Sequence, residues 1–266
     1  MALAVCATPI GNLDDVTLRV LEELRSADVI LCEDTRHTRV LLDRHGISGK
    51  LMSYHEHNEA KRAAEVLPRM EAGERFALVS DAGMPAISDP GARLVAAALE
   101  RGVPVTVLPG PTAVDTALVA SGFSAERYQF IGFLPRGARA LTSLWEELAS
   151  WPHPVVAFES PRRLPATLRS LADAQPAREV AVCRELTKKF EEVVRGTAAE
   201  LAARFSEAPK GEITLVLGPG SLSADVGAAI EAVGELVSAG LPRRQAADVV
   251  SRLTGASRNE LYRRTL

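Results

Sequence analysis

The chain has 266 residues, of which 47% are hydrophobic and 24% charged, a composition typical of a soluble globular protein with one large domain or two ordinary ones. No apolar run reaches the ~20 residues that a membrane-spanning helix requires. The opening MALAVCATPIG also lacks the basic start and the length of a signal peptide. We therefore expect a cytoplasmic protein that does not contact a membrane.

The first part of the chain alternates strand-like and helix-like runs. Amphipathic stretches such as 16–27 and 59–72 carry apolar residues at helical spacing. The apolar, strand-like runs between them are 3–8, 28–32, 50–54, 76–80 and 103–108. Because these strands are almost continuously apolar and separated by helices, they predict a mostly parallel sheet covered on both faces.

The pattern restarts after Gly122. The second set of strand-like runs is 128–133, 154–158, 179–184, 191–195 and 212–217. Residues 224–266 have no strand signal, and 241–266 predict two short helices around Thr254 and Gly255, since glycine is a natural helix stop. We therefore expect an α/β domain over 1–113, a second α/β domain over 114–222 and a helical segment over 223–266.

The three cysteines, Cys6, Cys32 and Cys183, each lie inside an apolar strand-like run without CxxC spacing. Such a scattered, odd set argues against a disulfide framework or a zinc site, and favours buried small side chains. His55 and His57 flank Glu56 and could place two metal ligands on one strand face. Without a third ligand motif, we expect no metal.

Six loops rich in proline, glycine and charged residues each follow a predicted strand. They are TPIGNL (8–13), CEDTRHT (32–38), SDAGMPAISDPG (80–91), LPGPTA (108–113), GFLPR (132–136) and FESPRRL (158–164). In open α/β sheets, this edge is where ligands bind. Proline and glycine hold a loop on a defined path, which suits a ligand bound by backbone groups. Turns needed only for packing would explain one or two such loops, but not six.

Several standard sites are absent from the sequence. It contains no GxGxxG and no GxxxxGK[ST] pattern, which excludes a dinucleotide fingerprint and a Walker phosphate loop. It also contains no GxSxG nucleophile signature. The six loops are therefore expected to bind their ligand without a dinucleotide fingerprint, a Walker phosphate loop or a GxSxG nucleophile.

The charge is unevenly distributed. The whole chain is −3, but residues 241–266 hold six arginines against one aspartate and one glutamate, a net +4, which leaves −7 for the other 240 residues. A basic tail on an acidic body is typical of a nucleic-acid contact. The alternative is a solvated helical face.

The motifs together resemble one family. TPIGNLDDVTLRVLEEL, CEDTRHT, HEHNE, LVSDAGMPAISDPG, LPGPTA, GFLPR, FESPRRL, CRELTKKFEEVVRG and GEITLVLGP are similar, in order and spacing, to the 16S ribosomal RNA (cytidine 2′-O)-methyltransferases. These belong to the tetrapyrrole methylase superfamily, the class III S-adenosylmethionine-dependent methyltransferases. The resemblance covers residues 3–217, and LPRRQAADVVSRLTGASRNELYRR extends it to the C-terminus. Met84 and Ala86 depart from the commoner threonine and bulkier aliphatic residue.

The resemblance implies two α/β domains with a cofactor cleft between them and a small helical C-terminal segment. It implies S-adenosylmethionine as the cofactor, held by the loop 80–91, without a metal. The implied substrate is 16S ribosomal RNA or the small ribosomal subunit, and the implied assembly is a homodimer. The implied cofactor contacts are Pro9, Ser80, Asp81, Ala82, Gly83, Met84, Pro85, Ile87, Thr112, Ala113, Phe133 and Leu134.

A ribose hydroxyl must lose its proton when it accepts a methyl group, so a positioned base would help. Glu33, Asp34, Asp81 and Glu159 all follow predicted strands. Glu159 is the first candidate base and Glu33 the second. The alternative role for Glu159 is an ion pair with Arg162 or Arg163 that shapes the loop, while Asp81 is expected to organise the cofactor loop through bonds to the backbone.

RNA recognition relies on contacts to the phosphate backbone and the 2′-hydroxyl groups. The candidate RNA contacts are Arg36, Arg136, Arg162, Arg163, Lys188, Arg243 and Arg244. Two other functions remain open from the residues. A methylase of a corrin or porphyrin ring on the same fold would give no reason for the basic tail. A non-catalytic RNA-binding module would have no affinity for S-adenosylmethionine.

Overall fold

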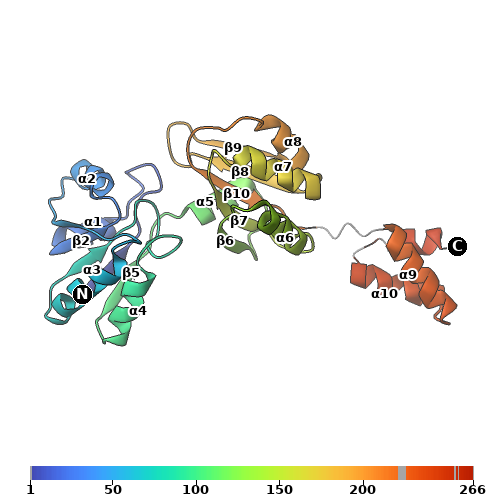
Figure 1. The fold of residues 1–266 in the computed structure, drawn as a ribbon, viewed down its shortest axis with the longest axis horizontal. Helices are drawn as coiled ribbons and strands as arrows, with labels where there is room; N and C mark the ends of the chain where they lie inside the picture. Colours follow the sequence, from blue (N-terminus) through green and yellow to red (C-terminus); the bar gives the residue numbers. More distant parts are fainter. Residues whose placement is uncertain (1, 221–225, 255, 257, 266) are drawn as a thin grey trace. The chain divides into compact units, whose positions relative to one another are not determined.

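The computed structural model describes residues 2–220, 226–254, 256 and 258–265, and the chain divides into two compact units (Figure 1). The N-terminal unit comprises Met1–Gly122 with the segments Val182–Val193 and Gly211–Thr214. The C-terminal unit comprises Phe123–Ala181, Val194–Lys210 and Leu215–Leu266.

A five-stranded sheet forms the centre of the N-terminal unit, with the order β3-β2-β4-β1-β5. Every pairing in it is parallel. Its elements are β1 (Leu3–Cys6), α1 (Leu18–Ser26), β2 (Val29–Cys32), α2 (Thr35–Arg44), β3 (Leu51–Ser53), α3 (Glu59–Glu71), β4 (Phe76–Leu78), α4 (Ala92–Glu100), β5 (Val105–Leu108) and α5 (Ala113–Ser121). The five strands and the parallel sheet predicted from the apolar runs are confirmed.

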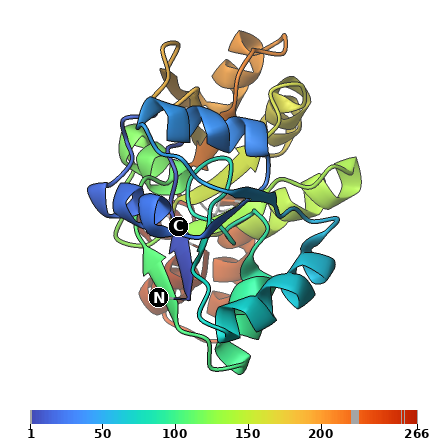
Figure 2. The same ribbon diagram turned by 90° about the vertical axis from the view of Figure 1, so that its left-hand side faces the viewer.

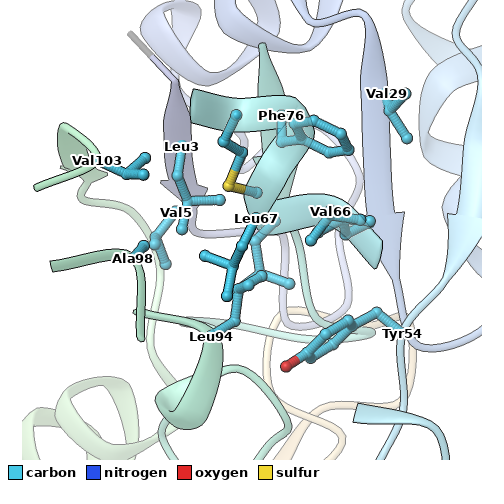
Figure 3. Packing of buried hydrophobic residues seen from close by; sticks show 13 residues of the cluster. Leu3, Val5, Val29, Tyr54, Val66, Leu67, Phe76, Leu94, Ala98 and Val103 are labelled. Atoms are coloured by element: carbon cyan, nitrogen blue, oxygen red, sulfur yellow. The ribbon is translucent and has the colours of Figure 1, made fainter. Parts of the chain in front are cut away.

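The strands of this sheet are apolar on both faces because helices cover both. Leu3 and Val5 of β1 and Phe76 of β4 point into one cluster, which Leu67 of α3 and Leu94 of α4 complete (Figure 3). The side chains that alternate with these pack on the opposite face against α1 and α2. Figure 2 shows α1 and α2, in blue, on the other side of the sheet from α3 and α4, in cyan to green.

A second five-stranded sheet has the order β6-β7-β10-β8-β9, with β6 and β7 parallel. Its elements are β6 (Gln129–Phe133), α6 (Ala138–Leu148), β7 (Val155–Glu159), α7 (Leu164–Ala174), β8 (Glu179–Arg184), β9 (Glu192–Thr197), α8 (Ala198–Arg204) and β10 (Ile213–Leu217). All five residues of β10 are buried, as expected for a strand covered on both faces. The three cysteines are free and buried, which confirms their predicted role as small core side chains.

The C-terminal segment is helical and has a small core of its own. It consists of α9 (Val226–Ser238), α10 (Arg243–Thr254) and α11 (Arg258–Arg264). Val233 of α9, Val250 of α10 and Leu261 of α11 are buried in one cluster. The two short helices predicted over 241–266 are confirmed; Gly255, the predicted stop between them, lies outside the described residues. Within the described parts of the chain, no helix has the length and apolar character needed to cross a membrane.

Candidate active site

The strand order of the first sheet places a topological switch point between β1 and β4. These neighbours are hydrogen-bonded, but the chain continues from β1 to α1 on one face and from β4 to α4 on the other. The loops that follow them therefore diverge at the carboxyl edge of the sheet. In open α/β folds such a divergence is the preferred place for a ligand.

The two diverging loops are tied to each other by backbone hydrogen bonds. The N–H of Thr8 donates to the carbonyl of Gly83 over 2.8 Å, and the N–H of Gly83 donates to the carbonyl of Thr8 over 3.0 Å. The buried hydroxyl of Thr8 also donates to the carbonyl of Ser80 over 3.0 Å. This pairing fixes the path of the loop 80–91 against the loop that follows β1.

The loop 80–91 holds an uncommon backbone conformation at four positions. Gly83 has φ 78° and Gly91 has φ 134°, which glycine adopts without steric cost. Ala86 at φ 68° and Ser88 at φ 64° also lie in the positive-φ half of the Ramachandran map, although they carry a Cβ atom. Such conformations persist where surrounding contacts enforce them, and they concentrate at ligand sites. A defined path was predicted for this loop from its prolines and glycines, and two of these four positions are glycines.

Contacts beneath the loop account for its shape. The N–H of Gly91 donates to the buried carboxylate of Glu59 over 3.0 Å. Gly91 has φ 134°, which residues with a side chain rarely adopt, and a Cβ atom there would also lie 2.7 Å from the side chain of Leu78, so the position favours glycine. A Cβ atom at Gly83 would lie 3.8 Å from the carbonyl of Pro111, which brings the 109–112 turn beside the loop.

A pocket of about 460 Å³ opens at the switch point within the N-terminal unit, a size in the usual range for small-molecule sites. Its lining residues are Thr8, Pro9, Ile10, Gly11, Leu13, His37, Thr38, Val40, Leu41, Ser80, Asp81, Ala82, Lys188 and Glu212. Pro9, Ser80, Asp81 and Ala82 were predicted as cofactor contacts, and the structure brings them together here. The contribution of α2, including His37, was not predicted, because CEDTRHT was interpreted as a loop over 32–38.

The helix α2 in fact begins at Thr35, inside that motif. The carboxylate of Asp34 caps it by accepting the N–H of Arg36 over 2.8 Å. The same carboxylate binds the guanidinium of Arg36 at 3.1 and 2.7 Å, and these bonds hold the pKa of Asp34 well below its usual range. The prediction of a loop over 32–38 was therefore wrong beyond Asp34, because a capping aspartate starts a helix there.

Carboxylates gather at the same edge of the sheet. The N–H of Asp34 donates to the carboxylate of Asp81 over 3.1 Å, so Asp81 bonds to the loop after β2, whereas the expectation was bonds within its own loop. Burial, and then the charge of Asp81, raises the pKa of Glu33. Burial, and then the charges of Glu33 and Asp81, raises the pKa of Asp89 to about 7. Perturbed carboxyl groups beside a pocket are typical of functional sites.

Lys188 reaches the pocket from a second segment with uncommon backbone angles. Glu185 at φ 51° and Thr187 at φ 65° precede it. Its ammonium lies 2.9 Å from Glu185 and 2.9 Å from Glu212, and its stem lies so close to Gly11 that a Cβ atom there would be 2.5 Å from the Cγ of Lys188. Glycine is therefore required at position 11, and the ammonium of Lys188 already has two carboxylate partners.

Glu159, the first candidate base, is buried at the end of β7 in the C-terminal unit. One carboxylate oxygen accepts the N–H of Ser160 over 2.7 Å, and the other accepts the hydroxyl of Thr167 over 2.5 Å. Arg163 lies 3.3 Å from that second oxygen and donates to the carbonyls of Leu134 and Pro135. These contacts correspond to the loop-shaping role that was the alternative for Glu159.

The other predicted cofactor residues differ in exposure. Met84 packs on the core beneath the sheet, and Ile87 is half exposed. Thr112 caps α5 by accepting the N–H of Asp115 over 3.1 Å, so Ala113 is the first residue of that helix. In the C-terminal unit, Phe133 is exposed and Leu134 is buried.

The candidate RNA contacts also separate by their surroundings. Arg136, Arg162 and Arg244 are exposed, whereas Arg243 is half-buried. Arg163 is occupied by Glu159 and two carbonyls, as described above. Within the tail, Arg258 forms an ion pair with Asp248 at 3.2 Å. Arg258 of α11 is therefore joined to α10 by an ion pair.

Two family models match the chain. The model described as Tetrapyrrole (Corrin/Porphyrin) Methylases matches residues 2–202, and the model described as RsmI C-terminal HTH domain matches residues 224–266. Solved structures agree at the level of the fold. The methyltransferase CobJ superposes with a TM-score of 0.62 at 20% identity, covering 82% of this chain and 94% of that one. Uroporphyrin-III C-methyl transferase from Thermus thermophilus, complexed with S-adenyl homocysteine, superposes with a TM-score of 0.58 at 20% identity. The match covers 81% of this chain and 96% of that one.

Fold, pocket and family model define the class: a tetrapyrrole methylase, a protein of the class III methylase fold. Relatives named Ribosomal RNA small subunit methyltransferase I identify the family within this class. The protein from Mesorhizobium japonicum is 45% identical over all of this chain and 91% of its own length. That from Thermotoga maritima is 46% identical over 81% of this chain and 97% of its own length. The chain belongs to the ribosomal RNA small subunit methyltransferase I family.

Proposed function

We propose that the chain uses S-adenosylmethionine to methylate the 2′-hydroxyl of a cytidine ribose at the decoding centre of 16S ribosomal RNA. The family gives the reaction class and the ribosomal RNA substrate. The observation that carries the proposal is the pocket at the switch point between β1 and β4, where the loops that follow these two strands are held together by the Thr8–Gly83 pairing. Loops held together in this way suit methyl transfer, because the in-line displacement depends on orientation.

The residues at the pocket fit the proposed cofactor. Ser80, Asp81 and Ala82 line it, and the adjoining loop 109–112 leads to Thr112 and Ala113 at the start of α5. When bound, S-adenosylmethionine supplies a sulfonium-linked methyl group. The chain must hold the acceptor hydroxyl in line with that methyl and exclude water. The structure with S-adenyl homocysteine belongs to a distant relative, and it supports this choice by analogy of fold.

The acceptor hydroxyl must also lose a proton. We assign this step to Glu33, which is half-buried at the end of β2 and whose pKa is raised by burial and by Asp81. A carboxylate of raised pKa is a better proton acceptor near neutral pH. In this assignment Glu159, with both oxygens bonded, positions the β7–α7 loop through Arg163.

The RNA is proposed to contact arginines of both units and of the basic tail. The match of residues 224–266 to the RsmI C-terminal HTH domain supports a nucleic-acid role for α9 to α11. We further propose that the protein acts as a homodimer in the cytoplasm, without a metal ion. Light scattering coupled to size exclusion would show twice the chain mass of 28.4 kDa for the dimer.

The test is a methylation assay on small ribosomal subunits from cells that lack the endogenous activity. Radiolabelled methyl from S-adenosylmethionine should enter 16S ribosomal RNA and be recovered as 2′-O-methylcytidine after nuclease digestion. Uroporphyrinogen III as the acceptor should stay unlabelled. Transfer to the ring and not to the RNA would overturn the proposal.

A further inference from the structure

A second concavity on the N-terminal unit lies beside the first turn of α2 and the start of β3. It has a volume of about 450 Å³ and is lined by Thr35, Arg36, Arg39, Gly49, Lys50 and Leu51. We call it the basic groove. Three of its six lining residues are cationic, and none is acidic.

The cations of the basic groove are not equally available. Arg36 is bound to the carboxylate of Asp34 at 2.7 Å. Arg39 and Lys50 are exposed, and among the described residues neither forms an ion pair within 4.0 Å. On a chain with a net charge of −3, this is a local excess of positive charge in a concave surface. Field lines concentrate in such a groove and favour an anionic ligand.

The basic groove and the pocket share one helix. Thr35, Arg36 and Arg39 of α2 line the groove, whereas His37, Thr38, Val40 and Leu41 of the same helix line the pocket. A ligand in the groove would therefore lie one helix width, roughly 10 Å, from the pocket. Consecutive phosphates of an extended RNA strand can cover such a distance in two or three nucleotides.

We propose that the basic groove binds the phosphate backbone of the RNA strand whose ribose enters the pocket, with Arg39 and Lys50 as the contacts. The inference rests on the proposed function and extends it to a surface outside the reaction site. Phosphate contacts position a strand without reading its sequence, so the groove would fix the register of the acceptor nucleotide. Arg36, in its ion pair with Asp34, lines the same groove.

The test uses the full chain carrying Arg39→Gln and Lys50→Gln together. Binding to small ribosomal subunits, and to a single-stranded RNA with the decoding-centre sequence, is measured at several salt concentrations. We expect affinity for both to fall on the order of tenfold at low salt, because two phosphate contacts and their released counterions are lost. The slope of log affinity against log salt should become shallower by about 1 for each lost contact.

Two controls separate charge from structure. Arg19→Gln with Lys61→Gln removes one exposed arginine and one exposed lysine from α1 and α3, and should bind RNA as the wild type does. Arg39→Lys with Lys50→Arg keeps both charges and should retain most of the affinity. The two double variants at Arg39 and Lys50, to glutamine and with the charges exchanged, should keep the melting temperature and S-adenosylmethionine affinity of the wild type. The reason is that Arg39 and Lys50 do not line the pocket.

The outcomes also separate this inference from the proposed function. If the wild type methylates the RNA but the groove variant matches it in affinity and salt slope, the groove proposal is wrong and the proposed function stands. If the wild type binds RNA without methylating it, the proposed function fails, and the variant comparison still decides the groove. A wild type that binds neither RNA nor subunits overturns both.

Discussion

At the scale of single residues, Gly83 joins the two loops of the pocket. Its φ of 78° is one that a β-branched side chain rarely adopts, and both its N–H and its carbonyl bond to Thr8. We predict that Gly83→Val weakens S-adenosylmethionine binding by about 2 kcal/mol or more, as backbone strain of this kind implies. Calorimetry with the folded variant measures this. Gly102→Val is the matched control. Gly102 has a similar φ of 70° and lies at the α4–β5 turn, and a Cβ atom added there would have no other atom within 4 Å.

Two carboxylates can be separated by a pair of matched substitutions. Glu33→Gln should lower the single-turnover rate by ~10²-fold, the usual size of a general-base contribution, while the melting temperature stays near that of the wild type. Glu159→Gln should instead destabilise the fold by about 1–3 kcal/mol, because one buried oxygen of Glu159 loses its charge beside Arg163. Its rate per folded molecule should stay close to normal.

The reverse pattern would assign the role of proton acceptor to Glu159. A folded Glu159→Gln variant with a ~10²-fold slower chemical step, together with a normal Glu33→Gln variant, would contradict the assignment made here. Thermal melts and single-turnover rates on both proteins are sufficient to decide it.

At the scale of elements, the loop 80–91 should make stability depend on pH. The pKa of Asp89 is raised to about 7 by burial and by Glu33 and Asp81, whereas an unfolded aspartate titrates near its ordinary value of about 3.9. Between about pH 4 and 7 the folded chain keeps a proton that the unfolded chain releases, so this contribution to stability is lost as the pH rises through 7. The melting temperature of Asp89→Asn relative to the wild type should rise between pH 5 and 8. A difference that stays constant over that range would show that Asp89 is not protonated in the folded chain.

The elements also show what the sequence could and could not predict. The apolar strands such as Val29–Cys32 were predictable, because a parallel sheet covered on both faces needs continuous apolar runs. The start of α2 was not, because the polar run from Asp34 to His37 looks like a loop until the cap of Asp34 is seen. The loops at the pocket were predicted from their proline and glycine content, and the individual cofactor contacts on them from the resemblance to the family. The segment from Glu185 to Lys188 lacks both residues, so its uncommon backbone angles left no signal.

At the scale of the whole molecule, charge divides between an acidic body and a basic tail. The cluster of Val233, Val250 and Leu261 joins α9 to α10 and α11, so removing only 241–266 would expose the apolar side of α9. A clean deletion therefore starts at residue 221. We predict that it keeps S-adenosylmethionine affinity and weakens binding to the small subunit, with a shallower salt dependence. Filter binding at several salt concentrations measures both effects.

Charge and shape in the tail can be told apart by substitution. Replacing four exposed arginines of the tail by glutamine, while Arg258 keeps its ion pair with Asp248, should reproduce much of the deletion phenotype if charge is the cause. These are Arg244, Arg252, Arg263 and Arg264. If this variant binds as the wild type does while the deletion does not, the tail acts through shape or subunit contacts. If neither change alters affinity, the tail is a solvated helical face.

The chemical identity of the methylated product tests the proposed function most directly. The purified chain, S-adenosylmethionine and unmethylated small ribosomal subunits are incubated together, and the digested 16S ribosomal RNA is analysed by mass spectrometry of nucleosides and of fragments. We predict one added methyl group per subunit, on the ribose of a single decoding-centre cytidine, and its loss with Glu33→Gln. A methyl group on a base, methylation spread over many nucleotides, or no transfer to RNA by a chain that binds S-adenosylmethionine would contradict it.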